Sequence, residues 1–99
     1  MDTYVILRRS GWRSPEDLEQ AAGRSTRTAD DQMPDDIRWI RSYVLDEGAG
    51  TLGTVCVYEA SSPEAIRKHA QMAGLPVDEI VAVADTVVVR PDPAAAETN

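Results

Sequence analysis

The only cysteine and the only histidine of the chain are Cys56 and His69. A neutral imidazole can ligate a metal ion or act as a general base. A lone cysteine among valines is ordinarily an inert buried thiol, and no helix begins at Cys56 to activate it. His69 is therefore the favoured reactive group. A half-buried histidine bonded to a backbone carbonyl has the same sequence pattern, so a structural role stays open.

Carboxylates offer a second source of ligands. Glu59 follows Cys56 closely, so a metal site in this chain would draw on His69, Cys56 and Glu59. One histidine and one cysteine cannot form a closed site of soft ligands, so carboxylates or a second subunit must contribute. Glu59 could equally be solvated at the end of its strand. The acidic run in residues 30–36 lacks the spacing and central glycine of a calcium loop, which favours a solvated connection.

Two arginines accompany aromatic residues in the predicted strands. Arg8 and Arg41, with Trp39 and nearby tyrosines, could hold an anionic or aromatic ligand. They could also form cross-strand stacks and interface salt bridges. The chain has no glycine-rich phosphate loop, no CxxC, no paired-histidine zinc motif and no Gly-x-Ser-x-Gly elbow.

Four predicted strands and two predicted helices position these residues. Residues 3–9, 37–45, 52–59 and 79–83 have the β-branched and aromatic composition of strands, and the last could extend to residue 89. Helices are predicted to begin after Ser14 and Ser62, each followed by Pro and Glu, and Gly74 can end the second helix. We expect the first helix to fade near residue 30.

The strand-helix-strand-strand-helix-strand order predicts a ferredoxin-like α+β fold. Right-handed crossovers would place both helices on one face of a four-stranded antiparallel sheet. A single domain over residues 1–90 is expected. Residues 91–99 contain no core-forming side chain and are expected to form a disordered tail.

Side-chain alternation sorts the strands into two sets. One set is aliphatic, and we expect it to face the helices. The other is predicted to gather on the helix-free face as a ligand cleft or dimer face; it comprises Tyr4, Ile6, Arg8, Trp39, Arg41, Tyr43, Cys56 and Tyr58. A monomer seldom exposes so large an apolar patch, so a second subunit, a ligand, or both would cover it. This predicts a homodimer of the α+β barrel type.

Composition narrows the class of partner. The formal net charge of -7 argues against nucleic acid, because polyanion binding needs clustered cations. A single cysteine excludes an intrachain disulfide. No apolar run is long enough to cross a bilayer, and no signal-peptide pattern precedes residue 8. A cytoplasmic protein without membrane partners is expected.

The chain resembles a family of small bacterial domains, largely uncharacterised, some of which bind nickel. The resemblance covers most of residues 37–83 and, more weakly, residues 3–22. It is carried by WIRSYV at 39–44, CVYEA at 56–60, PEAIRKHA at 63–70, GLP at 74–76 and DEI at 78–80. It implies a ferredoxin-like fold, a dimer, and nickel as the one cofactor to consider.

One departure from the family pattern opposes nickel. Relatives that bind it tend to carry an Asp-Val-His type stretch in the first strand, and Arg8 stands where that histidine would be. They also tend to have more histidine on the second helix, where only His69 remains. Cys56 and Glu59 do match the pattern. A fixed cation at a ligand position opposes metal binding.

Three hypotheses for function follow. The first is a dimeric binding module with a metal or small-ligand pocket beside the aromatic face. The second is a cofactor-independent enzyme, similar to small ferredoxin-like monooxygenases and isomerases, with His69 as general base and Arg8 or Arg41 steadying an oxyanion. The third is a structural subunit. A cavity with His69 in its wall would favour the enzyme.

Overall fold

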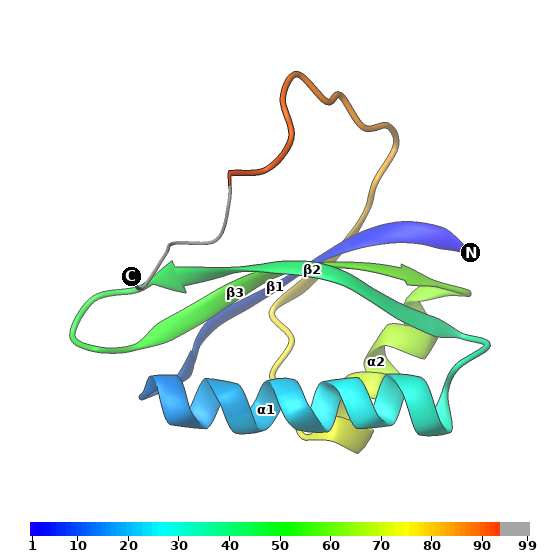
Figure 1. Ribbon diagram of the computed structural model, residues 1–99. Helices are drawn as coiled ribbons and strands as arrows, with labels where there is room; N and C mark the ends of the chain where they lie inside the picture. The colour runs from blue at the N-terminus through cyan, green and yellow to red at the C-terminus, as the bar shows by residue number, and fades with distance from the viewer. Residues whose placement is uncertain (94–99) are drawn as a thin grey trace.

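The fold is known from a computed structural model, which describes residues 1–93. Its elements are β1 (Asp2–Trp12), α1 (Pro15–Arg27), a short π-helix η1 (Thr28–Gln32), β2 (Ile37–Asp46), β3 (Leu52–Ala60), α2 (Pro63–Ala73) and β4 (Glu79–Ala82). The strands form one antiparallel sheet in the order β2-β3-β1-β4, and both helices cover the same face (Figure 1). The predicted ferredoxin-like α+β fold is confirmed.

Local capping explains where the helices begin and end. The Ser14 hydroxyl accepts a hydrogen bond from the Asp17 amide at 3.1 Å, and the Ser62 hydroxyl accepts one from Ala65 at 3.1 Å. Each cap contributes about 1 kcal/mol. Gly74 ends α2 in the left-handed region, with φ of 69°. In the part of the chain that the structure describes, no helix is long and apolar enough to cross a bilayer.

The core lies between the sheet and the helices. Inward side chains of β1 and β3 include Ile6 and Tyr58, and both are almost fully buried. They pack with Ile66 of α2, and Met33 and Ile37 close the same cluster beyond η1. The α1 residues that are buried, Ala21 and Ser25, are both small.

The helix-free face, which we call the outer face, is covered by aliphatic side chains. Val5 pairs with both Val57 and Val81, and Leu7 pairs with Val55. Val81 is 44% exposed, and Tyr43 of β2 is 46% exposed on the same face. This is the reverse of the predicted arrangement, in which the aliphatic set faces the helices.

The segment that follows β4 does not continue the sheet. Residues 84–93 arch over the outer face (Figure 1), and the Asp92 carboxylate accepts hydrogen bonds from Arg41 and Tyr43 of β2. The extension of the last strand to residue 89, which the sequence left open, does not occur: Val83 N still donates to the Thr3 carbonyl at 2.9 Å, but residues 84–93 form no strand. For the predicted disordered tail, residues 94–99 lie outside the described residues.

Candidate functional site

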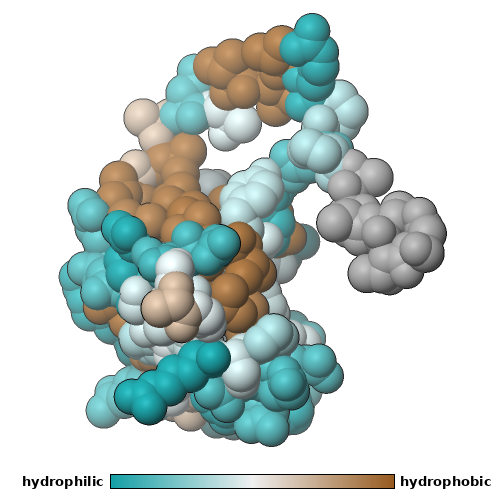
Figure 2. All heavy atoms as spheres, turned by 90° about the vertical axis from the view of Figure 1, so that its left-hand side faces the viewer, coloured by the Kyte–Doolittle hydropathy of each residue, from teal (hydrophilic) through white to brown (hydrophobic). Residues whose placement is uncertain are grey.

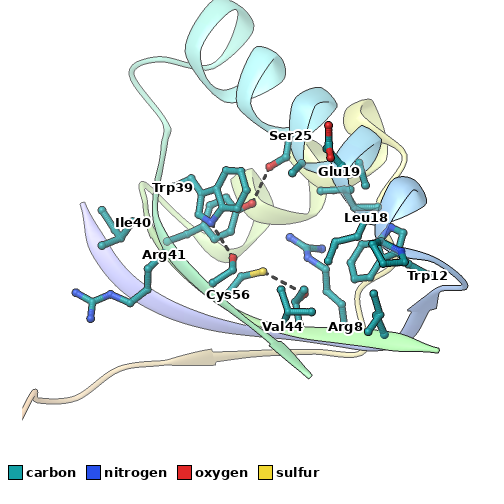
Figure 3. Close-up of a pocket in the computed structure, with 18 residues that line it drawn as sticks. Arg8, Trp12, Leu18, Glu19, Ser25, Trp39, Ile40, Arg41, Val44 and Cys56 are labelled. Carbon is teal, nitrogen blue, oxygen red and sulfur yellow. Dashed lines mark hydrogen bonds between the residues drawn. The ribbon is translucent and has the colours of Figure 1, made fainter. Parts of the chain in front are cut away.

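A cavity of about 730 Å³ lies between α1 and the sheet (Figure 3). Its walls are mainly apolar and aromatic, with a few hydroxyl groups and one buried guanidinium. The lining residues are Arg8, Trp12, Pro15, Leu18, Glu19, Ala21, Ala22, Ser25, Trp39, Ile40, Arg41, Ser42, Val44, Leu52, Thr54, Cys56, Tyr58 and Leu75. Cavities of this size and character are typical of small-molecule sites.

Residue size and a strand irregularity create this space. Three of the α1 residues that line the cavity, Ala21, Ala22 and Ser25, have short side chains, which leave room beside the sheet. The β2–β3 register shifts between Trp39 and Arg41. Such a bulge locally re-aims side chains of the strand, and here Trp39 and Ile40 both line the cavity.

Arg8 supplies the cavity's buried charge. Only 1% of the residue is exposed. Its Nη1 donates a hydrogen bond to the Pro76 carbonyl at 2.6 Å, and its Cζ lies 5.9 Å from the centroid of the Tyr58 ring. Nη2 is buried and has no hydrogen-bond partner. A buried, unpaired charged donor is costly, so this atom requires an explanation.

Tyr58 joins the cavity to the helix layer. Its hydroxyl lies 2.9 Å from Ser25 Oγ on α1, and burial raises the pKa of the phenol above its usual value. The Trp39 ring stacks on Tyr58 with centroids 6.1 Å apart and planes 8° from parallel. The Trp39 indole nitrogen donates to Ser42 Oγ at 2.8 Å, which fixes the ring plane. The cavity therefore has a rigid aromatic wall.

His69 is fully buried, and it does not line this cavity. Its Nε2 lies 3.0 Å from the Ser25 carbonyl oxygen, so Nε2 carries the proton and donates it. Nδ1 is then an unprotonated acceptor, and it is buried without a partner. Burial lowers the pKa of the imidazole, and the nearby Arg8 charge lowers it further. His69 is a neutral core residue whose ring meets Tyr58 edge-on.

The structure corrects the predicted face of the aromatic set. Ile6, Tyr4, Arg8, Cys56 and Tyr58 are buried on the helix side, and Trp39, paired with Tyr58, lies on that side too. The prediction was wrong because it took the aliphatic set as the core, whereas the larger aromatic residues fill the space beneath the short α1 side chains.

Arg41 and Tyr43 separate from that group. Both lie on the outer face because the β2 bulge changes the alternation after Trp39. They bond Asp92, and Figure 3 shows the Arg41 guanidinium directed away from the cavity. Grouping all four aromatic residues on one face was therefore wrong for Tyr43.

The three predicted metal ligands do not come together. Glu59 points to the outer face and pairs with Arg38 at 2.8 Å, whereas the buried Cys56 and His69 lie on the helix side. The Cys56 thiol donates to Thr54 Oγ1 at 3.2 Å. Over residues 1–93, no three His, Cys, Asp or Glu side chains gather closely enough to hold a metal ion.

Several residues that line the cavity were not predicted from the sequence to belong to a site. Ser25 was missed although it belongs to the short-residue side of the predicted first helix. Trp12 lies beyond the first predicted strand although it ends β1, and Thr54 lies within β3, where its polar side chain did not mark it as a core position. Leu75 follows a helix cap and contributes from a loop. A void depends on the sum of many side-chain volumes, which no local pattern records.

The family assignment agrees with this fold. The family model described as SCO4226-like, nickel responsive protein SCO4226-like, matches residues 4–83, so the chain belongs to this family of small α+β domains. A solved structure, titled as the crystal structure analysis of SCO4226 from Streptomyces coelicolor A3(2), is similar with a TM-score of 0.67 and 22% sequence identity. The match covers 86% of this chain and 99% of that one. No curated protein matches.

The family description raises the question of whether nickel fits this chain. His69 Nδ1 is a free acceptor, but the residue has no exposed surface that a ligand of another subunit could reach. The nearest charge that lowers its pKa is the Arg8 guanidinium, which repels a cation. The described donor groups therefore do not fit a nickel ion at His69 or in the cavity.

Proposed function

We propose that this protein binds a small organic molecule in the cavity between α1 and the sheet. The observation that carries the proposal is the cavity itself, which has a volume of about 730 Å³ in a chain of 99 residues. This volume lies within the range that small-molecule pockets occupy. The cavity's apolar wall and few hydroxyls match small-molecule sites.

Binding is favoured over catalysis for this cavity. The enzyme hypothesis requires His69 as general base, and a base must come within hydrogen-bond reach of a substrate proton. His69 does not line the cavity, and its Nε2 proton is held by the Ser25 carbonyl. Cys56 does line the cavity, but its thiol already donates a hydrogen bond to Thr54 Oγ1.

The test uses the two tryptophans of the chain, because both line the cavity. N-phenyl-1-naphthylamine, a neutral apolar probe, is expected to accept excitation energy from Trp12 and Trp39 in a saturable titration. Ala22→Phe adds a ring to the cavity wall and is expected to abolish the signal. Gln20→Phe, on the same helix but outside the cavity, is the matched control and should retain it. Equal binding by wild type and Ala22→Phe would contradict the proposal.

We also infer that two copies associate through the outer face. Val5, Val57 and Val81 lie side by side across three strands there, and no helix covers them. The segment of residues 84–93, which we call the arch, adds three consecutive valines, of which Val87 is 85% exposed. Figure 2 shows apolar atoms along this arch at the top of the molecule, standing away from the body.

A second copy of the chain is the occupant that this face favours. A sheet face can pair with itself about a two-fold axis, which is the commonest symmetry of soluble oligomers. The arch would then lie against the partner and cover its own valines. Size-exclusion chromatography with light scattering should give twice the chain mass of 10.8 kDa at micromolar concentration. A monomer under those conditions would contradict this inference.

A further inference from the structure

Arg8 carries an inference about the class of ligand. Among the described residues it is the only Arg, Lys, Asp or Glu that is buried. One of its terminal nitrogens is satisfied by the Pro76 carbonyl, and the other has no acceptor. Figure 3 shows the guanidinium within the ring of lining residues, between the sheet and α1. An unsatisfied, positively charged hydrogen-bond donor therefore lies in the wall of the cavity, where neighbouring atoms cover it in the unliganded chain.

No carboxylate of the described chain neutralises this charge. The four ion pairs there are formed by Arg9, Arg38, Arg41 and Arg67 with other acids. Glu19 is the single acidic residue in the cavity wall, and it is exposed at the α1 rim without bonding Arg8. The Tyr58 ring face stabilises the cation but cannot replace a lone-pair acceptor for Nη2.

The rest of the wall defines the body of the ligand. Trp39 and Tyr58 present nearly parallel rings, which suit a flat group. The remaining polar atoms near them are hydroxyls already engaged in bonds, such as Ser25 Oγ and Thr54 Oγ1. A phosphate would bring two charges to one guanidinium in an apolar wall, and the unpaired charge would oppose binding.

We propose that the ligand is a flat, apolar monocarboxylate whose carboxylate accepts a hydrogen bond from Arg8 Nη2 while its ring system lies against Trp39. This inference rests on the proposed function, because it assigns a chemical class to the occupant of the same cavity. The carboxylate of such a ligand would neutralise the buried Arg8 charge and accept the hydrogen bond that Nη2 lacks.

The test compares two probes that differ only in charge. 1-Naphthaleneacetate and 1-naphthaleneacetamide have the same ring and nearly the same size. Isothermal titration calorimetry of wild type at pH 7.5 should show the acid binding roughly 10- to 100-fold more tightly, as expected for a charge-assisted hydrogen bond in a buried site. Equal affinities would overturn the proposal without any variant being made.

Variants then locate the preference. Arg8→Met should bind acid and amide with similar affinities, whereas Arg9→Met, which removes the adjacent exposed arginine, should keep the wild-type ratio. A preference that persists in Arg8→Met would overturn the assignment to Arg8. Titration with neutral N-phenyl-1-naphthylamine distinguishes a wrong ligand class from a wrong proposed function. If this neutral probe binds and the acid shows no preference, the ligand class fails alone; if none of the three compounds binds, the proposed function fails with it.

Discussion

Replacing Arg8 with methionine should stabilise the unliganded protein. The substitution keeps an unbranched side chain of similar reach and removes a charge from a wall where the residue is 1% exposed. The losses are the 2.6 Å bond to the Pro76 carbonyl, about 2 kcal/mol, and the contact with the Tyr58 ring, about 1 kcal/mol. The gain is the desolvation cost of the buried charge, about 4 to 5 kcal/mol, which includes the unsatisfied Nη2 donor.

The balance favours methionine by about 1 to 2 kcal/mol, because the desolvation of an unpaired charge is the largest of these terms. Urea unfolding followed by tryptophan fluorescence measures this difference directly. For a domain of this size, each kcal/mol corresponds to a change of about 4 to 8 °C in Tm. Arg8→Met should therefore unfold at a higher temperature while losing its preference for acids. Residues that bind ligands commonly lower the stability of the unliganded protein, so replacing one of them can raise stability while weakening binding.

A lower free energy of unfolding in Arg8→Met than in the wild type would contradict this prediction. It would show that the bond to Pro76 and the Tyr58 contact hold the fold together, and that Arg8 is a structural residue. Arg9→Met is the matched control. Arg9 is an exposed neighbour paired with Glu47, so its removal should change the free energy of unfolding by less than about 1 kcal/mol.

Three further predictions concern other parts of the molecule. Tyr58→Phe removes the partner of Ser25 Oγ and should lower the free energy of unfolding by about 1 to 2 kcal/mol in urea; an unchanged midpoint would show that the 2.9 Å contact contributes nothing. Because burial lowers the pKa of His69, the imidazole binds a proton in the unfolded chain at pH values where it stays neutral in the folded chain. Stability should fall as pH drops below about 6.5, by at most about 1.4 kcal/mol per pH unit, and His69→Gln should lose this component; parallel pH profiles would contradict it. Val57→Asp on the outer face should yield a folded monomer in light scattering, and an intact dimer would exclude this face as the interface.

The helices and strands could be predicted because their signals are local. Ser14 and Ser62 cap the helices as predicted, since a hydroxyl three residues before a free amide needs no information from elsewhere. Gly74 adopts the left-handed conformation for the same reason. The strand order then follows from crossover handedness, which is nearly invariant in proteins.

The faces of the sheet could not be predicted, because both alternating sets of side chains are apolar. Alternation groups Tyr4 with Arg8 and Cys56 with Tyr58, as the structure does, but it does not say which set meets the helices. That choice depends on volume: the rings of Trp39 and Tyr58 fit against the short side chains of α1, whereas valines make a smooth outer face. The bulge after Trp39, which moves Arg41 outward, leaves no signal in residue types.

The cavity and its buried charge depend on tertiary packing. Arg8 follows the apolar run of residues 4–7 and precedes Arg9, a position typical of the exposed end of a strand. Its burial and its missing acceptor emerge only when β1, α1 and the Pro76 loop meet. For the same reason the sequence left open whether His69 lies at a pocket wall or in the core, whereas the fold surrounds it completely.

A ¹H–¹⁵N NMR titration of the wild-type protein with 1-naphthaleneacetate tests most directly whether the cavity between α1 and the sheet binds a ligand. Binding between α1 and the sheet should shift the indole signals of Trp12 and Trp39 and the amides of residues 18–25 and 54–58, and leave residues 84–93 unchanged. Shifts confined to the outer face or the arch, or no shifts at millimolar probe, would show that this cavity is not a binding site.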